Sequence, residues 1–397
     1  MKSRTAVIGG GYGGMAAAIF EKRKGNDVTV FERQESLGKK LLLTGNGRCN
    51  ISNENIDVTD YVTDDEEKLR SILARFDRKT EEDFFSSIGL LTRSDRGCLY
   101  PMTGKAKTVG NCLVYALNEL GADIRTGCYV SSIKRNADGL FEITAGSKVY
   151  GRFTKVILSS GGMAGIYDES SKNGNLLAVS CGHTMKEGHP GLTAVICSDD
   201  RKKLKKLDGI RVRAGATVIK KEKIIAFEAG EIQHTVDGLS GIPVFGLSRY
   251  IDDMSDTVIR IDYLPGVSFD DFKLRTLKFN NRSVETFLEG MVLSPIAEMA
   301  AGNCGLNYHA RISGLSENEI KKMYLALTSA DFRPMQLNGY KKAQISTGGV
   351  PLSETDENMQ SLYCKGLYFA GEVLNVSGRC GGYNLHFAAA SAYCAAF

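Results

Sequence analysis

The stretch that decides the fold lies near the amino terminus, where residues 5–31 read TAVIGGGYGGMAAAIFEKRKGNDVTVF. An apolar run over 5–8 predicts a short buried strand, and the glycine-rich run over 9–14 predicts a turn. The small and apolar residues that follow predict a helix over 15–24, and 28–31 predicts a second strand. Because a strand, a helix and a strand follow one another, we expect a β-α-β unit with a parallel sheet.

Three glycines in the turn, Gly9, Gly11 and Gly14, have the G-x-G-x-x-G spacing of dinucleotide-binding turns. The first glycine makes the tight turn, the second lets a pyrophosphate approach the backbone, and the third lets helix and strand pack closely. The phosphates would lie at the free N–H groups of a helix amino terminus. Glu32 follows the second strand, where a carboxylate can accept hydrogen bonds from ribose hydroxyls. This carboxylate argues against a 2′-phosphate, although the neighbouring Arg33 leaves that alternative open.

The glycine spacing fits NAD and FAD equally well, because both present an ADP half to such a unit. The next segment separates them, since residues 37–53 read LGKKLLLTGNGRCNISN, a long loop rich in glycine, asparagine and cations. A dehydrogenase would normally continue with another β-α unit, whereas this loop can wrap an extended ligand. The sequence has one dinucleotide fingerprint, so NADH or NADPH would bind only transiently, as an electron donor.

Further glycine-rich segments follow predicted strands elsewhere. One apolar strand leads into Ser-Ser-Gly-Gly at 159–162, and a second leads into Gly371 and Glu372. In open α/β sheets, ligands bind at the carboxyl ends of the strands. Near the carboxyl terminus, two glycines at 381–382 precede a helix predicted to begin near His386, whose N–H groups could face the electron-rich end of a flavin.

The middle of the chain, from residue 191 to 339, has a different pattern. Strand-like stretches come first and helical stretches second, without a phosphate-binding glycine turn. We therefore expect this stretch to form a second domain, inserted into a discontinuous first domain that comprises 1–190 and 340–397. The β part of the insert is expected at about 191–265 and the helical part at about 266–335.

Composition limits the classes of partner. The 397 residues include 44 glycines but only 7 prolines, which argues against low complexity. The net charge of +4 is too small to indicate a nucleic-acid partner. Ten cysteines without a C-x-x-C pair indicate no metal site and suit a reducing cytoplasm. The uncharged stretch over 5–20 is like a signal peptide, but it holds five glycines and is shorter than a membrane span. We expect a cytoplasmic protein that binds no membrane.

Five segments form a pattern in the order VIGGGYGGMAAA (7–18), GKKLLLTGNGRCNIS (38–52), HTVDGLSGIPVFGLSR (234–249), STGGV (346–350) and GLYFAGEVLNVSGRCGGYNLHFA (366–388). Together they resemble the BaiN/YhiN-type, or aminoacetone-oxidase-like, flavoproteins of the glutathione-reductase-like FAD superfamily. The resemblance spans nearly the whole chain. It implies an α/β fold with a Rossmann-like FAD-binding domain, an inserted β-barrel-like plus helical substrate domain, and FAD bound non-covalently.

The glycine turns and the resemblance together give the expected cofactor contacts. Those for the ADP half are Gly9, Gly11, Tyr12, Gly13, Gly14, Glu32, Arg33 and, through its backbone, Val130. Those in the loop around the ribityl and isoalloxazine groups are Lys40, Leu41, Asn46, Gly47, Arg48, Cys49 and Asn50. The remaining expected contacts are Ser160, Gly161, Gly162, Gly371, Glu372, Val373, Gly382, Tyr383, Asn384 and Leu385.

The resemblance implies a flavin oxidoreductase, in which FAD supplies the redox chemistry and the protein supplies position and electrostatics. We favour NAD(P)H-driven reduction of a small unsaturated substrate. The alternatives are a flavin oxidase that passes electrons from an amine or similar substrate to oxygen, a tRNA-modifying flavoprotein and a non-catalytic flavin-binding protein. No residue is assigned as catalytic, but Arg48, His309, Tyr383 and His386 are candidates for substrate anchoring or proton delivery.

Overall fold

The chain forms two compact units in a computed structural model that describes residues 3–165, 173–198 and 201–397, without the side chains of 201–203. The first unit comprises Met1–Gly191 and Tyr340–Phe397, and the second comprises Leu192–Gly339. Each unit has a hydrophobic core of its own.

The first unit is built on a five-stranded parallel sheet. Its strand order is β21 (Leu367–Phe369), β11 (Lys155–Leu158), β1 (Arg4–Ile8), β2 (Asp27–Phe31) and β7 (Asp123–Arg125). All four strand pairs are parallel. Because β1 lies in the middle and is buried on both faces, it reads as an apolar run rather than as an alternating pattern. The expected β-α-β unit is confirmed.

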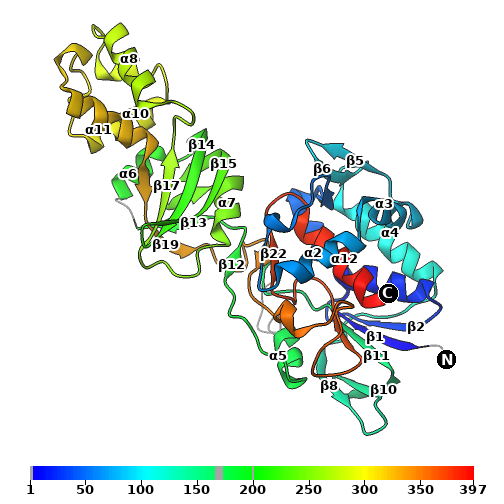
Figure 1. The fold of residues 1–397 in the computed structure, drawn as a ribbon. Helices are drawn as coiled ribbons and strands as arrows, with labels where there is room; N and C mark the ends of the chain where they lie inside the picture. Colours follow the sequence, from blue (N-terminus) through cyan, green and yellow to red (C-terminus); the bar gives the residue numbers. More distant parts are fainter. Residues whose placement is uncertain (1–2, 166–172, 199–200) are drawn as a thin grey trace. The chain divides into compact units, whose positions relative to one another are not determined.

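Helices and a small sheet cover this parallel sheet (Figure 1). The helix α1 (Tyr12–Arg23) packs against α12 (Tyr383–Ala396) and α4 (Ala106–Glu119). On the side of the sheet away from α12 lies an antiparallel sheet of β8 (Val130–Arg135), β9 (Phe141–Ala145) and β10 (Lys148–Phe153). The ring of Phe31 joins the two sheets, since its centroid lies 5.1 Å from that of Tyr150 and 6.0 Å from that of Phe153.

The rest of the first unit consists of short elements around the ends of the parallel strands. They are η1 (Leu41–Gly47), β3 (Ser52–Asn53), η2 (Val58–Asp60), β4 (Tyr61–Thr63), α2 (Glu66–Arg75), α3 (Arg78–Ser87), β5 (Thr92–Asp95), β6 (Cys98–Pro101), α5 (Asn173–Ser180), β12 (Pro190–Gly191), β20 (Ile345–Ser346), η5 (Leu352–Glu354) and β22 (Val376–Gly378). They form three small sheets, β3-β6-β5, β22-β4 and β12-β20. The segment expected as a loop over 37–53 thus contains a short 3-10 helix, η1, and the strand β3.

Two helices begin earlier than the sequence indicates. The helix α1 begins at Tyr12 rather than at residue 15, and α12 begins at Tyr383 rather than near His386. In α1 the third glycine serves packing rather than a turn, because a Cβ at Gly14 would lie 1.9 Å from the Gly9 carbonyl oxygen. In α12 the N-cap Gly382 has a φ of 97°, and this left-handed residue lets the helix start at once.

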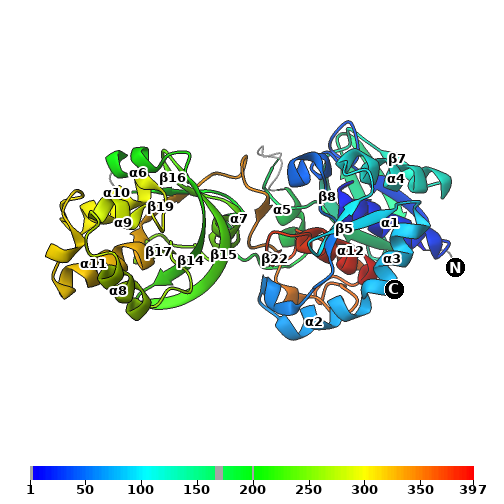
Figure 2. The same ribbon diagram turned by 90° about the horizontal axis from the view of Figure 1, so that it is seen from above.

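The second unit holds a seven-stranded antiparallel sheet (Figure 2). The strand order is β18 (Ala330–Phe332), β17 (Thr257–Asp262), β14 (Arg211–Lys220), β15 (Lys223–Thr235), β16 (Gly238–Ser240), β13 (Val195–Cys197) and β19 (Pro334–Leu337). Its helices are α6 (Arg201–Leu207), α7 (Ile242–Ser248), α8 (Phe269–Lys278), α9 (Val284–Leu288), α10 (Ser294–Asn303), η4 (Ile312–Gly314) and α11 (Glu317–Thr328). The expected order of strands first and helices second is wrong at the end, because β18 and β19 follow the helices and form the two edges of the sheet.

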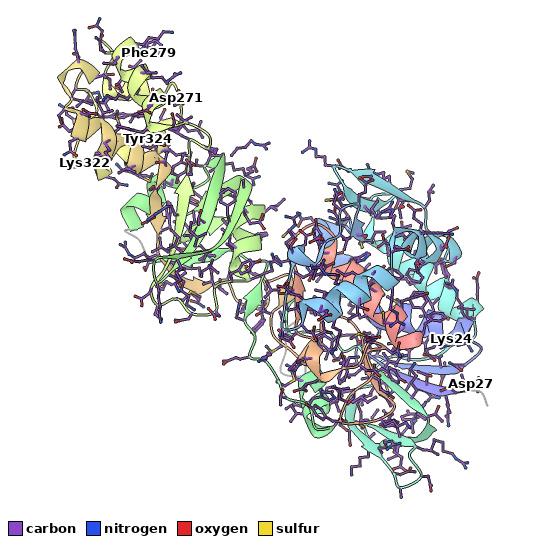
Figure 3. All side chains as sticks on the ribbon, in the orientation of Figure 1. Lys24, Asp27, Asp271, Phe279, Lys322 and Tyr324 are labelled. Carbon is purple, nitrogen blue, oxygen red and sulfur yellow. The ribbon has the colours of Figure 1, made fainter. Side chains whose placement is uncertain are left out.

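The helical part of the second unit packs around Tyr324 of α11 (Figure 3). Its ring centroid lies 5.4 Å from that of Phe269 and 5.5 Å from that of Phe272, and its hydroxyl donates to the Val267 carbonyl at 2.9 Å. Within the described ranges of both units, no helix combines the length and the hydropathy needed to span a membrane.

A buried ion pair fastens α1 to the parallel sheet. Glu21 is fully buried and accepts from the Lys155 ammonium at 2.7 Å and from the Thr5 hydroxyl at 3.1 Å. Lys155 also donates to the carbonyl of Ala395 in the last turn of α12, and Lys24 (Figure 3) donates to another carbonyl of that turn. Two lysines therefore satisfy free carbonyl groups at the carboxyl end of α12.

Replacement of Glu21 tests this pair. We expect Glu21→Ala to lower the free energy of unfolding of the first unit by about 3–5 kcal/mol, because it leaves a buried lysine charge without its partner. Burial already lowers the pKa of Lys155, and Glu21 opposes that shift. Urea unfolding followed by circular dichroism measures the effect. Glu82→Ala is the control, since Glu82 pairs with Arg78 on the surface. An equal loss of stability in both variants would contradict a special role of the buried Glu21–Lys155 pair.

Candidate functional site

The glycine turn leaves space at the amino terminus of α1. A Cβ at Gly9 would lie 2.2 Å from the Ser159 carbonyl oxygen, so the turn touches the end of β11 directly. Gly11, in contrast, has no atom within 4 Å of the position of its missing Cβ. It is the N-cap of α1, and no side chain caps the helix there. Free N–H groups beside open space are the arrangement that binds phosphate.

Glu32 holds the turn at the end of β2. It is buried, with 8% of its surface exposed. One carboxylate oxygen accepts from the Gly10 N–H at 2.6 Å, and the other accepts from the Gln34 N–H at 2.8 Å. Each oxygen keeps a lone pair, so the carboxylate can still accept hydrogen bonds from the hydroxyls of a ribose.

A cavity opens at this end of the parallel sheet. It encloses about 870 Å³ of empty space, which includes solvent at its open mouth. Nine of the expected contacts line it, namely Gly9, Gly11, Glu32, Arg33, Lys40, Val130, Ser160, Gly161 and Gly162. The first turn, the end of β2 and the end of β11 thus come together around one space, while the other expected contacts lie outside this lining.

Several residues that line the cavity are not predicted from the sequence. They include Gln34, Lys39, Cys128, Tyr129 and Asn173. The side-chain amide of Asn173 donates to the Val130 carbonyl at 2.6 Å, which ties the start of α5 to the start of β8. The Cys128 N–H donates to the Glu32 carbonyl at 2.7 Å, so the chain after β7 lies beside the end of β2. If residues 123–125 are recognised as the next parallel strand, residues 128 and 129, which follow it, are predicted to lie at the cavity beside the expected Val130.

An ion pair joins three glycine-rich segments that are far apart in the sequence. The Lys40 ammonium lies 2.6 Å from one Glu372 carboxylate oxygen, and the Ser346 N–H donates to the other at 2.8 Å. The Ser346 hydroxyl in turn accepts from the N–H groups of Met163 and Ala164 at 2.6 and 3.0 Å. Lys40 and Glu372, two of the expected cofactor contacts, therefore belong to one hydrogen-bonded network with Ser346.

The segment after Lys40 is a strained turn with a buried end. Asn46 and Cys49 have positive φ values of 54° and 57°, and Gly47 has one of 81°. Leu41 packs in the core, and Cys49 is fully buried, which raises the pKa of its thiol to about 11. The Cys49 thiol is therefore neutral at physiological pH and unsuited to nucleophilic or redox chemistry.

The start of α12 is shaped by its own side chains. The Asn384 amide accepts from the Gly378 N–H and donates to the Gly378 carbonyl, each at 2.8 Å. A Cβ at Gly382 would lie 2.2 Å from the Ser52 carbonyl oxygen. No side chain caps this helix. Its amino-terminal N–H groups can therefore stabilise negative charge on a ligand.

The other expected contacts of this region lie in the packing beneath it. Gly13 faces Ala388, and the Gly371 N–H donates to the Ser391 hydroxyl at 2.9 Å. Val373 is fully buried, and Leu385 packs against the core.

Three buried polar atoms provide a test of whether these segments suit a dinucleotide. The Tyr12 hydroxyl, the Asn50 amide oxygen and the Ser160 hydroxyl have no hydrogen-bond partner among the described residues. Buried polar groups normally have partners, so these three indicate a missing one. Ser160 lines the cavity beside the open space at Gly11. A ligand rich in hydroxyls and phosphate oxygens, bound in the cavity, would give the Ser160 hydroxyl a partner.

Three of the four catalytic candidates, Arg48, Tyr383 and His386, are not among the residues that line the cavity, and the fourth, His309, belongs to the second unit. Arg48 stacks on Tyr100 with its guanidinium carbon 4.5 Å from the ring centroid, and it pairs with Asp95 at 3.4 Å. His309 lies in the second unit, where its ring contacts Glu285 at 3.0 Å and is exposed.

The other two candidates are buried in the first unit. His386 contacts the Glu81 carboxylate at 2.8 Å and the Ser52 hydroxyl at 3.1 Å through Nδ1. The Tyr383 hydroxyl accepts from Arg379 at 3.0 Å, and burial raises its pKa. Both side chains make contacts that support the packing of α12.

Comparisons with known proteins agree with this arrangement. The family described as "HI0933-like protein Rossmann domain" matches residues 3–397, so the chain belongs to that family. A 3-dehydro-bile acid delta(4,6)-reductase from Clostridium scindens is 34% identical, over 99% of this chain and 98% of the relative. A ribosomal RNA dihydrouridine synthase from Haemophilus influenzae is 25% identical, over 99% and 98%.

A solved structure shares the fold. The 3-ketosteroid-delta4-(5alpha)-dehydrogenase from Rhodococcus jostii RHA1 has a TM-score of 0.54 and 14% identity, over 100% of this chain and 96% of that one. The α/β class with a Rossmann-type first unit is confirmed. The chain is an enzyme, a flavin-dependent oxidoreductase of the HI0933-like family. The individual cofactor contacts stay predictions.

Substitution at Gly11 separates folding from cofactor binding. Because an added methyl group meets only open space, we expect Gly11→Ala to change the stability of the apoprotein by less than about 1 kcal/mol. The same methyl group would occupy space that the pyrophosphate needs, so we expect FAD affinity to fall by at least about tenfold. Fluorescence titration with FAD measures this. Gly302→Ala in α10, also in open space, is the control. Unchanged affinity in Gly11→Ala would place the phosphates elsewhere.

A second prediction concerns the effect of the Lys40–Glu372 ion pair on FAD affinity. Without the lysine, the Glu372 carboxylate would face a bound diphosphate uncompensated, so we expect Lys40→Met to weaken FAD binding about tenfold. The double variant Lys40→Met/Glu372→Gln should regain most of that loss. Lys39→Met is the control, because Lys39 also lines the cavity but donates to Gln34 at 2.9 Å. If Lys39→Met and Lys40→Met lose equal FAD affinity, and the double variant regains none of it, the ion pair has no effect on FAD binding.

Proposed function

We propose that the enzyme uses NADH or NADPH to reduce a carbon–carbon double bond in a small unsaturated ring substrate, through FAD held non-covalently. The 34% identity to the bile acid reductase, over nearly the full length of both chains, is the observation that carries this proposal. The single dinucleotide turn supports a nicotinamide that binds only transiently. The ten cysteines, which include no C-x-x-C pair, support a reducing, cytoplasmic location.

Different residues of the first unit would bind different parts of the cofactor. Gly9, Gly11 and the amino terminus of α1 would bind the diphosphate, and Glu32 would bind the ribose of the ADP half. Lys40 pairs with the Glu372 carboxylate and would keep that charge from opposing a bound diphosphate. These groups are fixed to backbone N–H groups or to each other before any ligand arrives, so little ordering is required on binding.

Bound FAD supplies a ring that accepts hydride from a nicotinamide and returns it to a substrate. The protein's contribution is electrostatic, because the uncapped amino terminus of α12 favours negative charge on a neighbouring ring. Burial keeps the Cys49 thiol protonated, so it adds no competing negative charge. We propose that the Leu192–Gly339 unit supplies contacts to the substrate, since it holds a separate core and no phosphate-binding turn.

A second candidate is reduction of a pyrimidine ring in RNA. The 25% identical relative named as a ribosomal RNA dihydrouridine synthase favours it, and its match covers the same length. The small net charge of this chain argues against it, because RNA binding normally requires a strongly basic surface.

Anaerobic reduction tests the proposed reaction. We expect the purified holoenzyme to show a flavin spectrum that NADH or NADPH bleaches, and a bile acid with a conjugated 4,6-dien-3-one to restore it. Loss of the dienone absorbance should match NAD(P)H consumption mole for mole. The reaction should also proceed without oxygen.

Other outcomes point to the other candidates. Bleaching by neither nicotinamide, with peroxide formed from an amine in air, would indicate an oxidase and overturn the proposal. Reoxidation by unmodified ribosomal RNA, but by no dienone, would indicate the RNA reaction instead. A protein that binds no FAD would contradict the flavin assignment itself.

A further inference from the structure

Two half-exposed thiols meet on the surface of the first unit, outside the cavity. Cys181 directly follows α5, and Cys364 lies in the turn before β21. The two segments approach each other here, since a Cβ at Gly182 would lie 3.5 Å from the Tyr363 Cβ, and the thiols of the adjacent Cys181 and Cys364 interact. Both lie in irregular backbone, where small shifts cost little.

The surrounding contacts hold the two segments together independently of the thiols. The His183 imidazole contacts the Ser361 hydroxyl at 2.7 Å, and the same hydroxyl accepts from the Cys364 N–H at 2.8 Å. A Cβ at Gly182 would lie 3.5 Å from the Tyr363 Cβ, and the His183 and Tyr363 rings are 5.1 Å apart. The two chain segments are therefore in van der Waals contact beside the thiol pair.

The two sulfurs differ in acidity. The hydrogen bond from Cys181, and to a smaller degree the charge of Arg135, lower the pKa of Cys364 to about 7. Burial raises the pKa of Cys49 and of Cys394 to about 11. Cys364 is thus a thiolate in part at neutral pH, with a second thiol in contact.

We propose that Cys181 and Cys364 form a redox-modification site, which low-molecular-weight disulfides such as glutathione disulfide convert into an intramolecular disulfide. The Cys364 thiolate attacks one sulfur of glutathione disulfide, forms a mixed disulfide and releases one glutathione thiolate, which takes up a proton. The Cys181 thiol then loses its proton, attacks the Cys364 sulfur and releases the second glutathione. Two thiols are oxidised, and one glutathione disulfide is reduced to two glutathione molecules.

The site reaches the cofactor region through α5. This helix begins at Asn173, whose amide holds the Val130 carbonyl at the cavity wall, and it ends one residue before Cys181. A disulfide would tie the far end of this helix to the turn at 361–364. The proposal does not depend on which substrate the flavin reduces.

Oxidation of the holoenzyme with glutathione disulfide at pH 7 tests the site. We expect an intact mass lower by two hydrogen atoms, and a proteolytic peptide pair joined through Cys181 and Cys364. Cys181→Ser should instead carry one glutathione at Cys364. We expect the thiols of Cys364→Ser to be oxidised about fivefold more slowly than those of the wild type, because this variant lacks the more acidic thiol. The factor is modest because a thiolate of lower pKa is more abundant but less nucleophilic.

Cys112→Ser is the matched control. Cys112 is half-exposed, and burial raises the pKa of its thiol, so this variant should oxidise like the wild type. A disulfide mapped to other cysteines, or absence of glutathione at Cys364 in Cys181→Ser, would overturn the proposal. Dithiothreitol should restore the original mass in the wild type.

Discussion

Contact between backbone and backbone at Gly9 and Gly14 is the constraint on which the rest of the first unit depends. At both positions the nearest atom is a carbonyl oxygen, closer than any side chain allows. Gly9 brings the end of β11 against the first turn, and Gly14 brings α1 against the same turn. The turn is therefore packed against backbone at Gly9 and Gly14, whereas the space beside Gly11 is open to a ligand.

Two carboxylates, the buried Glu32 and the partly exposed Glu372, extend this arrangement away from the turn. Glu32 accepts from the backbone N–H groups of Gly10 and Gln34, and Glu372 accepts from the backbone N–H group of Ser346. An acid that only contacted a ligand would be costly to bury in the ligand's absence. Here the same groups orient the loops around them, so structural and binding roles coincide in single residues.

How much the sequence predicts follows from the range of the interactions involved. The β-α-β unit and Glu32 could be predicted because their signal lies within about thirty consecutive residues. Asn173 could not, since its role depends on a hydrogen bond to Val130 across the fold. His386 reads as a candidate acid in the sequence, but its partner Glu81 comes from a distant helix. The strands β18 and β19 were missed because short edge strands carry little periodic signal.

The discontinuity of the first unit has a consequence for synthesis on the ribosome. Its central sheet gains the edge strand β21 only from residues 367–369, and α1 is covered by α12, the last helix of the chain. The Leu192–Gly339 unit, in contrast, is complete before either emerges. The inserted unit can therefore fold while the chain is still growing. The nucleotide-binding unit must wait until β21 and α12 have emerged, and until then Glu21, Lys155 and the face of α1 that packs on α12 lack these contacts.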